Sequence, residues 1–185
     1  MLKVYAMSVA GEDRHLAARM LLRWKYEELF SQEMPEILES EDGKPYFADA
    51  SCYFSISYTG DFCFVAISDT PVGLDCEKIR SVSSDAVVRI LSPAEWRQYS
   101  SAKDPAEMFM RFWTLKEAYC KFSGLGIVKS KIRHTEFDLT RLSPYLSGHE
   151  ELRFWCRRLD SGLSDVVLSL CSNSMHRPEF YIVEI

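Results

Sequence analysis

The sequence predicts an α+β fold made of two similar subdomains packed against each other within one chain. The 185 residues are 47% hydrophobic and 13% aromatic, with only 8 Gly and 7 Pro, which is typical of a globular core. Helix signals followed by strand signals occur in both halves, and this order indicates an α+β architecture. No repeat, low-complexity segment or linker separates the halves. We therefore place the boundary in the hinge near residues 81–85, giving subdomains 1–83 and 84–185.

The first half is predicted to be one helix on a small sheet. Residues 1–7 read as a strand. Residues 13–30 predict an amphipathic helix, in which Leu16, Met20 and Trp24 lie four apart with Ala17 and Leu21 beside them. After a turn or loop at Gly43-Lys44-Pro45, turn residues separate three short strands, at 53–57, 62–68 and 72–77.

The second half has clear helix starts. Ser92-Pro93 and Asp104-Pro105 each combine an N-cap residue with Pro at the first helical position, and a Glu follows three residues after the cap. The second of these helices is expected to run to about Ser123, where Gly124 is a natural stop. Strands are expected beyond it, with a turn at 160–162 between two of them; they span 136–139, 152–159, 166–171 and 180–185.

Charge is segregated along the chain, although the formal net value is only −5. Residues 27–42 contain seven acids and no base, whereas residues 111–133 contain six bases and one acid. The basic segment is either a solvated face or a binding surface for a highly anionic small molecule or an acidic protein.

Membrane and secretion signals are missing from the sequence. The longest apolar run, 62–67, is far shorter than the ~20 residues of a membrane helix, and no signal peptide is recognisable. The six cysteines include no C-x-x-C pair, so we expect reduced thiols. These features predict a cytoplasmic protein with neither a membrane nor a nucleic-acid partner.

Two carboxylates are expected on one face of the strand at 72–77. Side chains alternate along a strand, so Asp75 and Glu77 project together, about 7 Å apart. They repel each other unless a cation lies between or above them. A hard divalent metal would satisfy them, and a solvated outer face is the alternative.

The helix at 105–123 carries a third carboxylate. Glu117 and Lys121 are neighbours on one side of it, beside a core stripe at Phe112, Leu115, Tyr119 and Phe122. Alone, this is an ordinary ion pair worth ~0.3 to 0.5 kcal/mol. The other carboxylates, a second lysine and the glycine-flanked loop at 123–126 favour a functional role.

Four blocks of sequence, in the correct order, resemble the 4'-phosphopantetheinyl transferase superfamily, specifically its larger pseudodimeric branch of the surfactin synthetase activating type. They are G-K-P at 43–45, F-S-I-S-Y-T-G at 54–60, V-G-L-D-C-E at 72–77 and F-W-T-L-K-E-A-Y-C-K-F-S-G-L-G-I at 112–127. The resemblance covers roughly residues 12–130, and the last 55 residues match only by expected topology.

The resemblance implies an activity at the interface of the two subdomains. Such enzymes transfer 4'-phosphopantetheine from coenzyme A to a serine hydroxyl of an apo acyl or peptidyl carrier protein and release adenosine 3',5'-bisphosphate. By resemblance, Asp75, Glu77 and Glu117 hold a Mg²⁺ ion that bridges the pyrophosphate. Glu117, directly or through a metal-bound water, takes the serine proton. Lys121 contacts the pyrophosphate and stabilises the leaving group. Lys116 matches a second lysine of the family and is also expected to bind coenzyme A.

Other positions carry over to coenzyme A binding. Lys44 and Pro45 are expected against the adenine end, and Ser57 is expected to donate to a phosphate. Arg14 has the spacing of the arginine that binds the 3'-phosphate, although a surface arginine is the alternative. Tyr58 stands where the family usually has His, and the region before the first helix is short. Tyrosine is uncharged at neutral pH, so we expect weaker or rearranged phosphate binding.

Two other functions remain open: a non-catalytic module of the same fold that binds coenzyme A or a carrier protein, and a metal-dependent phosphohydrolase with water as the acceptor. An acidic carrier protein is expected to dock on the basic, apolar stretch 126–131, which contains Lys129 and Lys131. A site formed between two halves of one chain needs no partner subunit, so we expect a monomer.

Overall fold

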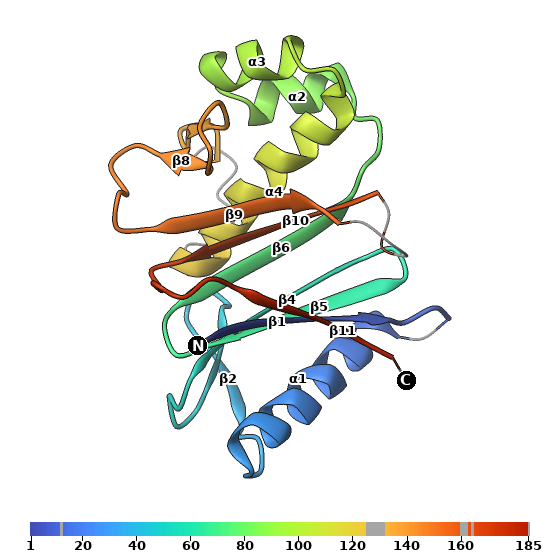
Figure 1. The fold of residues 1–185 in the computed structure, drawn as a ribbon, viewed down its shortest axis with the longest axis vertical. Helices are drawn as coiled ribbons and strands as arrows, with labels where there is room; N and C mark the ends of the chain where they lie inside the picture. The colour runs from blue at the N-terminus through green and yellow to red at the C-terminus, as the bar shows by residue number, and fades with distance from the viewer. Residues whose placement is uncertain (12, 125–131, 160–162, 164, 185) are drawn as a thin grey trace.

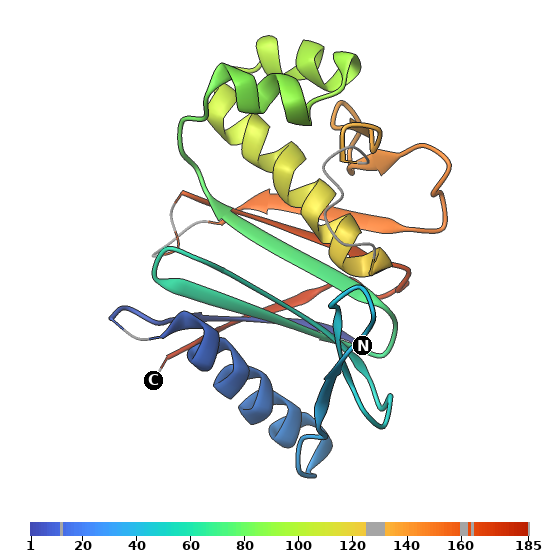
Figure 2. The same cartoon turned by 180° about the vertical axis from the view of Figure 1, so that it is seen from behind.

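The computed structural model describes residues 1–11, 13–124, 132–159, 163 and 165–184, and its fold is a mixed α+β fold, as predicted (Figures 1 and 2). The first half contains β1 (Leu2–Ser8), α1 (Arg14–Phe30), β2 (Ile37–Glu39), β3 (Pro45–Phe47), β4 (Tyr53–Thr59) and β5 (Phe62–Ser68). The chain continues through β6 (Val72–Lys78), α2 (Ser84–Ile90), α3 (Pro93–Ser100), α4 (Pro105–Ser123), β7 (Phe137–Asp138), β8 (Tyr145–Leu146), β9 (Arg153–Arg158), β10 (Val166–Ser172) and β11 (Glu179–Val183).

The strands form two main sheets with the same internal order. The first has the order β11-β1-β5-β4 and the second β6-β10-β9, while β2-β3 and β7-β8 are short hairpins. In each sheet, an opening strand is followed along the chain by helical structure, a hairpin and two further strands. The last strand of each series lies in the middle: β5 between β1 and β4, and β10 between β6 and β9. β11 then returns to pair in parallel with β1. The boundary between residues 83 and 84 stays a prediction; β6, which precedes it, belongs to the second sheet.

Three apolar clusters hold these layers together. One joins α1 to the first sheet, a second takes side chains from both sheets, and a third joins α4 to the second sheet. Figure 2 shows α1 and α4 at opposite sides of the paired sheets. Hydrophobic burial is thus continuous from one helix to the other, which fixes the two sheets relative to each other.

Helix α1 is rotated relative to the sequence prediction. Leu16 and Met20 are about 60% exposed and Trp24 is 45% exposed, so the prediction was wrong for these three, whereas Ala17 and Leu21, which it placed beside them, are buried. The buried stripe lies beside it and contains Ala17, Ala18, Leu21, Leu22 and Tyr26. Small alanines let the helix backbone approach the sheet closely, which the larger side chains would prevent.

Helix α4 agrees with its prediction at both ends. Asp104 caps its first turn by accepting the backbone N–H of Glu107, and Gly124 adopts the left-handed conformation that ends it, with φ +71°. The helix lies very close to β6 at Gly73: a Cβ there would fall 2.0 Å from the Ala118 carbonyl oxygen. This approach brings the Glu117 face of α4 over the carboxylates of β6.

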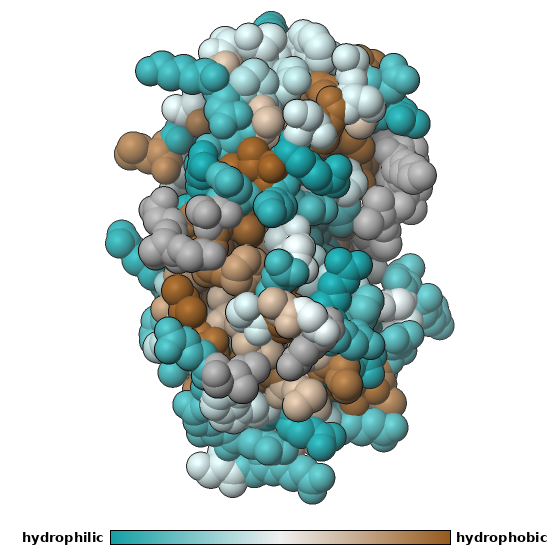
Figure 3. Space-filling view, turned by 90° about the vertical axis from the view of Figure 1, so that its right-hand side faces the viewer, coloured by the Kyte–Doolittle hydropathy of each residue, from teal (hydrophilic) through white to brown (hydrophobic). Residues whose placement is uncertain are grey.

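The helices were compared with the length and hydrophobicity that a membrane-spanning segment needs. Within the described residues, no helix is both long and apolar enough to cross a bilayer. On the face shown in Figure 3, hydrophobic patches are broken up by hydrophilic residues.

Candidate active site

The three predicted carboxylates lie where β6 faces α4. Asp75 and Glu117 are only 6% and 5% exposed, and Glu77 is half-buried nearer the surface. Burial raises the pKa of Glu117 to about 7, and the negative charge of Asp75 adds to this effect. Burial also raises the pKa of Asp75, and burial together with Asp75 raises that of Glu77. The shared electrostatic effects show that the three groups form one acidic cluster.

Lys121 forms an ion pair within this cluster. Its Nζ lies 2.8 Å from Asp75 Oδ1 and also donates to the Ile56 carbonyl of β4 at 3.2 Å. Burial alone would lower the pKa of Lys121, but the ion pair with Asp75 outweighs it and raises the pKa. The predicted proximity of Glu117 and Lys121 to the strand carboxylates is therefore present in the fold.

Two oxygens of the cluster are buried without a hydrogen-bond partner: Asp75 Oδ2 and Glu117 Oε1. An unsatisfied buried oxygen is costly, and such atoms at a functional site indicate an absent ion or ligand. Across the described parts of the chain, no three His, Cys, Asp or Glu side chains converge closely enough to hold a metal ion. Binding a metal thus requires side-chain movement, but carboxylate oxygens are the donors that Mg²⁺ prefers, and two of them are free to accept it.

Ser57 lies in this site, where its hydroxyl group donates a hydrogen bond to a carboxylate. Ser57 Oγ donates to Asp75 Oδ1 at 2.9 Å, and the serine is 6% exposed. A phosphate contact, as predicted for Ser57, would require this bond to break.

Lys116 is directed away from the acidic cluster. It is fully buried, pairs with Glu95 at 2.8 Å and donates to three backbone carbonyls, those of Ile90, Ile132 and Thr135. An ammonium group has three protons, and these four acceptors leave none of them for a further ligand. The prediction that Lys116 contacts coenzyme A is not supported by this arrangement. The hydrogen bonds of Lys116 instead connect α4 to the end of α2 and to residues 132–135.

Lys44 and Pro45 line a cavity of about 330 Å³ that also contains Glu117 and Lys121. Lys44 Nζ donates to the Phe122 carbonyl at 2.7 Å, near the C-terminal end of α4. Burial lowers the pKa of Lys44. The structure thus brings these four predicted residues into one hollow between β3, β4 and α4.

Arg14 and Tyr58 form a separate group at the start of α1. The Arg14 guanidinium carbon lies 4.9 Å from the centre of the Tyr58 ring, and His15 packs edge-on against the same ring at 4.5 Å. His15 was missed from the sequence, because nothing in the linear pattern shows that it faces the strand residue Tyr58. These cationic or titratable side chains lie outside the set that lines the Lys44 cavity.

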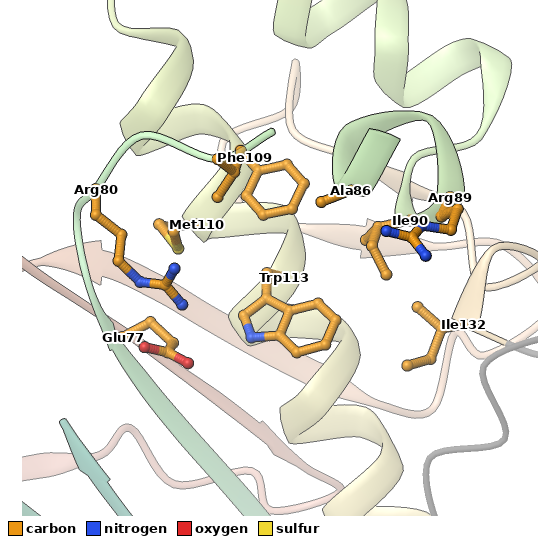
Figure 4. Close-up of a pocket in the computed structure, with 10 residues that line it drawn as sticks. Glu77, Arg80, Ala86, Arg89, Ile90, Phe109, Met110, Trp113 and Ile132 are labelled. Atoms are coloured by element: carbon orange, nitrogen blue, oxygen red, sulfur yellow. The ribbon is translucent and has the colours of Figure 1, made fainter. Parts of the chain in front are cut away.

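A larger apolar cavity of about 570 Å³ opens on the other side of the acidic cluster, at Glu77 (Figure 4). Figure 4 shows Glu77 and Arg80 at one side of it, side chains of α4 such as Trp113 in the middle, and Ile90 and Ile132 at the opposite side. The Trp113 side chain lies in the same cavity and partly offsets the rise in the pKa of Glu77. Sequence analysis missed this cavity, because α2, which forms one wall of it, was not predicted.

The fold and site define a class of α+β protein with a buried acidic site between a strand of one sheet and a packed helix. Residues 71–171, more than half of the chain, match the model of the 4'-phosphopantetheinyl transferase superfamily. The chain belongs to this superfamily, and the family prediction is confirmed.

Relatives from several bacteria show the same assignment. The chain is 34% identical over 121 residues to the 4'-phosphopantetheinyl transferase psf-1 of Bacillus pumilus, which covers 62% of this chain and 51% of that protein. It is 36% identical over 112 residues to a putative 4'-phosphopantetheinyl transferase of Haemophilus influenzae, covering 55% and 46%. With the 4'-phosphopantetheinyl transferase Sfp of Bacillus subtilis it shares 31% over 124 residues, covering 63% and 55%. The chain spans about half the length of the curated relatives it matches. These relatives support the surfactin synthetase activating branch.

Proposed function

We propose that this protein transfers the 4'-phosphopantetheine group from coenzyme A to a serine hydroxyl of an apo acyl or peptidyl carrier protein, with Mg²⁺, and releases adenosine 3',5'-bisphosphate. One observation carries the proposal: two buried carboxylate oxygens without partners, on Asp75 and Glu117, lie beside the partly buried ammonium group of Lys121 within the family-matched segment. Such a site suits a diphosphate and a divalent cation together.

The chain's own groups have separate tasks in this reaction. The serine oxygen attacks the phosphorus that carries pantetheine, and the bond from that phosphorus to the bridging oxygen breaks. Glu117, which lies beside Lys121 on α4, is proposed to accept the serine proton, directly or through a water. Lys121 stabilises negative charge on the departing bisphosphate. Asp75, Glu77 and Glu117 would hold Mg²⁺, which supplies charge neutralisation at the diphosphate.

Coenzyme A binding is proposed to extend from the cavity of Lys44 and Pro45, at the adenine end, toward Lys121. That these residues share one cavity supports the assignment. The Arg14 and Tyr58 pair is proposed for the 3'-phosphate, with Arg14 held over the tyrosine ring.

The acceptor side and the assembly are also proposals. The carrier-docking stretch 126–131, with Lys129 and Lys131, lies outside the described residues. The shared strand order of the two sheets supports a pseudodimer of similar halves in one chain with the site at their junction, and such a site would be complete in a monomer. The six cysteines are free thiols, which supports a cytoplasmic enzyme.

Mass spectrometry tests this proposal directly. The protein is incubated with coenzyme A, Mg²⁺ and several apo carrier domains, and the phosphopantetheine adduct on serine is measured. We expect an adduct with the wild-type chain, none with Glu117→Ala or Asp75→Ala, and a normal yield with Glu27→Gln, which alters an exposed carboxylate of α1. Circular dichroism establishes that the inactive variants are folded.

The other outcomes separate the alternatives. Coenzyme A binding without an adduct on any carrier would indicate a non-catalytic binding module. Hydrolysis of coenzyme A at its diphosphate without a carrier would indicate a phosphohydrolase. Full activity in Glu117→Ala would contradict the assigned base and metal ligand.

A further inference from the structure

A row of hydroxyl side chains lies along the junction of the two sheets. On β4, Ser55, Ser57 and Thr59 occupy alternate positions and are 6–7% exposed. Side chains at alternate positions of a strand share one face, so all three point the same way. The face they occupy is turned toward β6.

Each hydroxyl accepts a backbone N–H from β6, and the spacing is regular. The donors are Leu74 to Ser55 at 2.9 Å, Cys76 to Ser57 at 3.2 Å and Lys78 to Thr59 at 3.0 Å. β6 is the edge strand of its sheet on this side, and its outward N–H groups would be buried without partners. The hydroxyls therefore take the place of a backbone ladder.

Two of the three hydroxyls also donate a proton onward to a predicted metal ligand. Ser57 Oγ donates to Asp75 Oδ1 at 2.9 Å and Thr59 Oγ1 to Glu77 Oε2 at 3.4 Å. In each case the carboxylate belongs to the residue just before the N–H donor. At the third position that residue is Gly73, which has no side chain, and Ser55 has no carboxylate partner among the described residues.

The consequence is visible at Asp75. Ser57 and Lys121 both bind Oδ1, which leaves Oδ2 buried and without a partner. A carboxylate held by one oxygen in this way has a fixed orientation, and its other oxygen is available as a ligand. Loss of Ser57 would let the carboxylate rotate and share both oxygens with Lys121.

We propose that Ser57 and Thr59 are positioning residues that fix the carboxylates of Asp75 and Glu77 for binding a divalent cation. The inference rests on the proposed function, because it takes these carboxylates as metal ligands. It assigns Ser57 to the metal side of the site, in contrast to the phosphate contact predicted from the sequence, and it adds Thr59.

The test measures metal affinity without turnover. Mn²⁺ is titrated into the full chain and free Mn²⁺ is followed by electron paramagnetic resonance. Groups that orient metal ligands typically change affinity about 10- to 100-fold when removed. We expect a loss of this size for Ser57→Ala. The loss for Thr59→Val should be smaller, because the hydrogen bond from Thr59 to Glu77 is longer than that from Ser57 to Asp75.

The chain offers a matched control in Ser55→Ala. This variant loses the same kind of N–H acceptor as Ser57→Ala, so the midpoints of urea unfolding should fall by similar amounts. Its Mn²⁺ affinity should stay within about twofold of wild type, because no carboxylate is released. The variants Ser57→Thr and Thr59→Ser retain a hydroxyl and should restore most of the affinity. If Ser57→Ala does not fold, Thr59→Val, which preserves shape, carries the test.

Equal Mn²⁺ affinities for wild type, Ser57→Ala and Thr59→Val would overturn the inference. So would an equal loss in Ser55→Ala, since the effect would then belong to the sheet junction in general. Failure of the proposed function looks different: the wild-type chain would bind Mn²⁺ with the expected order among variants, yet form no adduct on any carrier.

Discussion

At the scale of single residues, the site combines like charges that the protein alone does not fully neutralise. Lys121 and Arg80 supply two positive charges, but Asp75, Glu77 and Glu117 supply three potential negative ones. Burial weakens solvation of each carboxylate, so the folded chain favours protonation of at least one of them. A bound divalent cation would remove this preference for protonation. The free energy of unfolding should therefore depend on both pH and metal.

The first prediction concerns Glu117→Gln in metal-free protein. The folded pKa of Glu117 is about 7, above its ordinary value of 4.5, so folding favours its protonated form. Its contribution to stability is complete below about pH 4.5 and is lost as the pH rises through 7. At pH 8, Glu117→Gln should therefore be more stable than wild type by about 3 kcal/mol at most. Urea unfolding at pH 5 and pH 8 measures the difference.

Mg²⁺ provides the control for this prediction. Added Mg²⁺ should stabilise the wild-type chain more at pH 8 than at pH 5, because only the ionised carboxylates bind it well. The variant should show a smaller increase. A wild-type unfolding free energy that did not depend on pH between 5 and 8, with or without metal, would show that Glu117 ionises normally.

At the scale of elements, the contact between β6 and α4 determines whether the acidic cluster exists. Gly73→Ala would place a Cβ 2.0 Å from the Ala118 carbonyl oxygen and 2.4 Å from the Phe122 nitrogen. Both contacts are with backbone, so α4 must move away. We expect a loss of about 3 kcal/mol or more in unfolding free energy, together with loss of Mn²⁺ binding. Urea unfolding and metal titration measure these effects.

Gly11→Ala is the control for this prediction, because it replaces a glycine by alanine without creating a steric overlap. Gly11 has φ +81°, but a Cβ at this position would meet no atom within 4 Å, so its replacement should cost only ~1 kcal/mol and leave metal binding unchanged. Gly73→Ala with the stability of Gly11→Ala would mean that α4 tolerates the displacement.

The buried pair of Lys116 and Glu95 gives a second prediction for the elements. Lys116→Met would leave the Glu95 carboxylate buried with no positive charge, and the carbonyls of Ile90, Ile132 and Thr135 would lose a shared donor. We expect a loss of ~3 to 5 kcal/mol in unfolding free energy. Adding Glu95→Gln should recover part of it, because the remaining group is neutral. A loss below about 1 kcal/mol would contradict the structural role of Lys116.

Local sequence signals predicted some elements well and others poorly for identifiable reasons. Helix α4 was predicted from its Asp104 cap and Gly124 stop, because both act within a few residues. Helix α1 was placed correctly, but only part of its buried face was predicted, since two apolar stripes compete and only the sheet selects between them. The motif containing Lys116 looked catalytic, and its partner Glu95 is close only in the fold.

At the scale of the whole molecule, the site depends on both sheets, although α4 and β6 carry its acids. β4 of the first sheet contributes Ser57 and the Ile56 carbonyl to the groups around Asp75 and Lys121. The four proposed catalytic and metal residues were predicted from two sequence blocks, whereas only the order of helices and strands in the two halves, and not the strand order within the sheets, was predicted. Similar topology requires similar apolar patterns, not similar residues, so a search for repeats does not detect it.

The last prediction concerns β11, which returns from the second half to the edge of the first sheet. It pairs in parallel with β1, and Tyr181 stacks on Tyr5 with ring centres 5.3 Å apart. A chain ending at residue 176 would expose the edge of β1, a strand with largely buried side chains. We expect a lower unfolding midpoint and concentration-dependent self-association, because an exposed edge strand pairs with other chains. Phe180→Ala is the matched control: it removes side-chain packing and the contact with Arg157 at 3.8 Å but retains the strand. Sedimentation velocity should then show association of the truncated chain only, and equal association of both variants would assign the effect to packing at Phe180 and not to the uncovered edge.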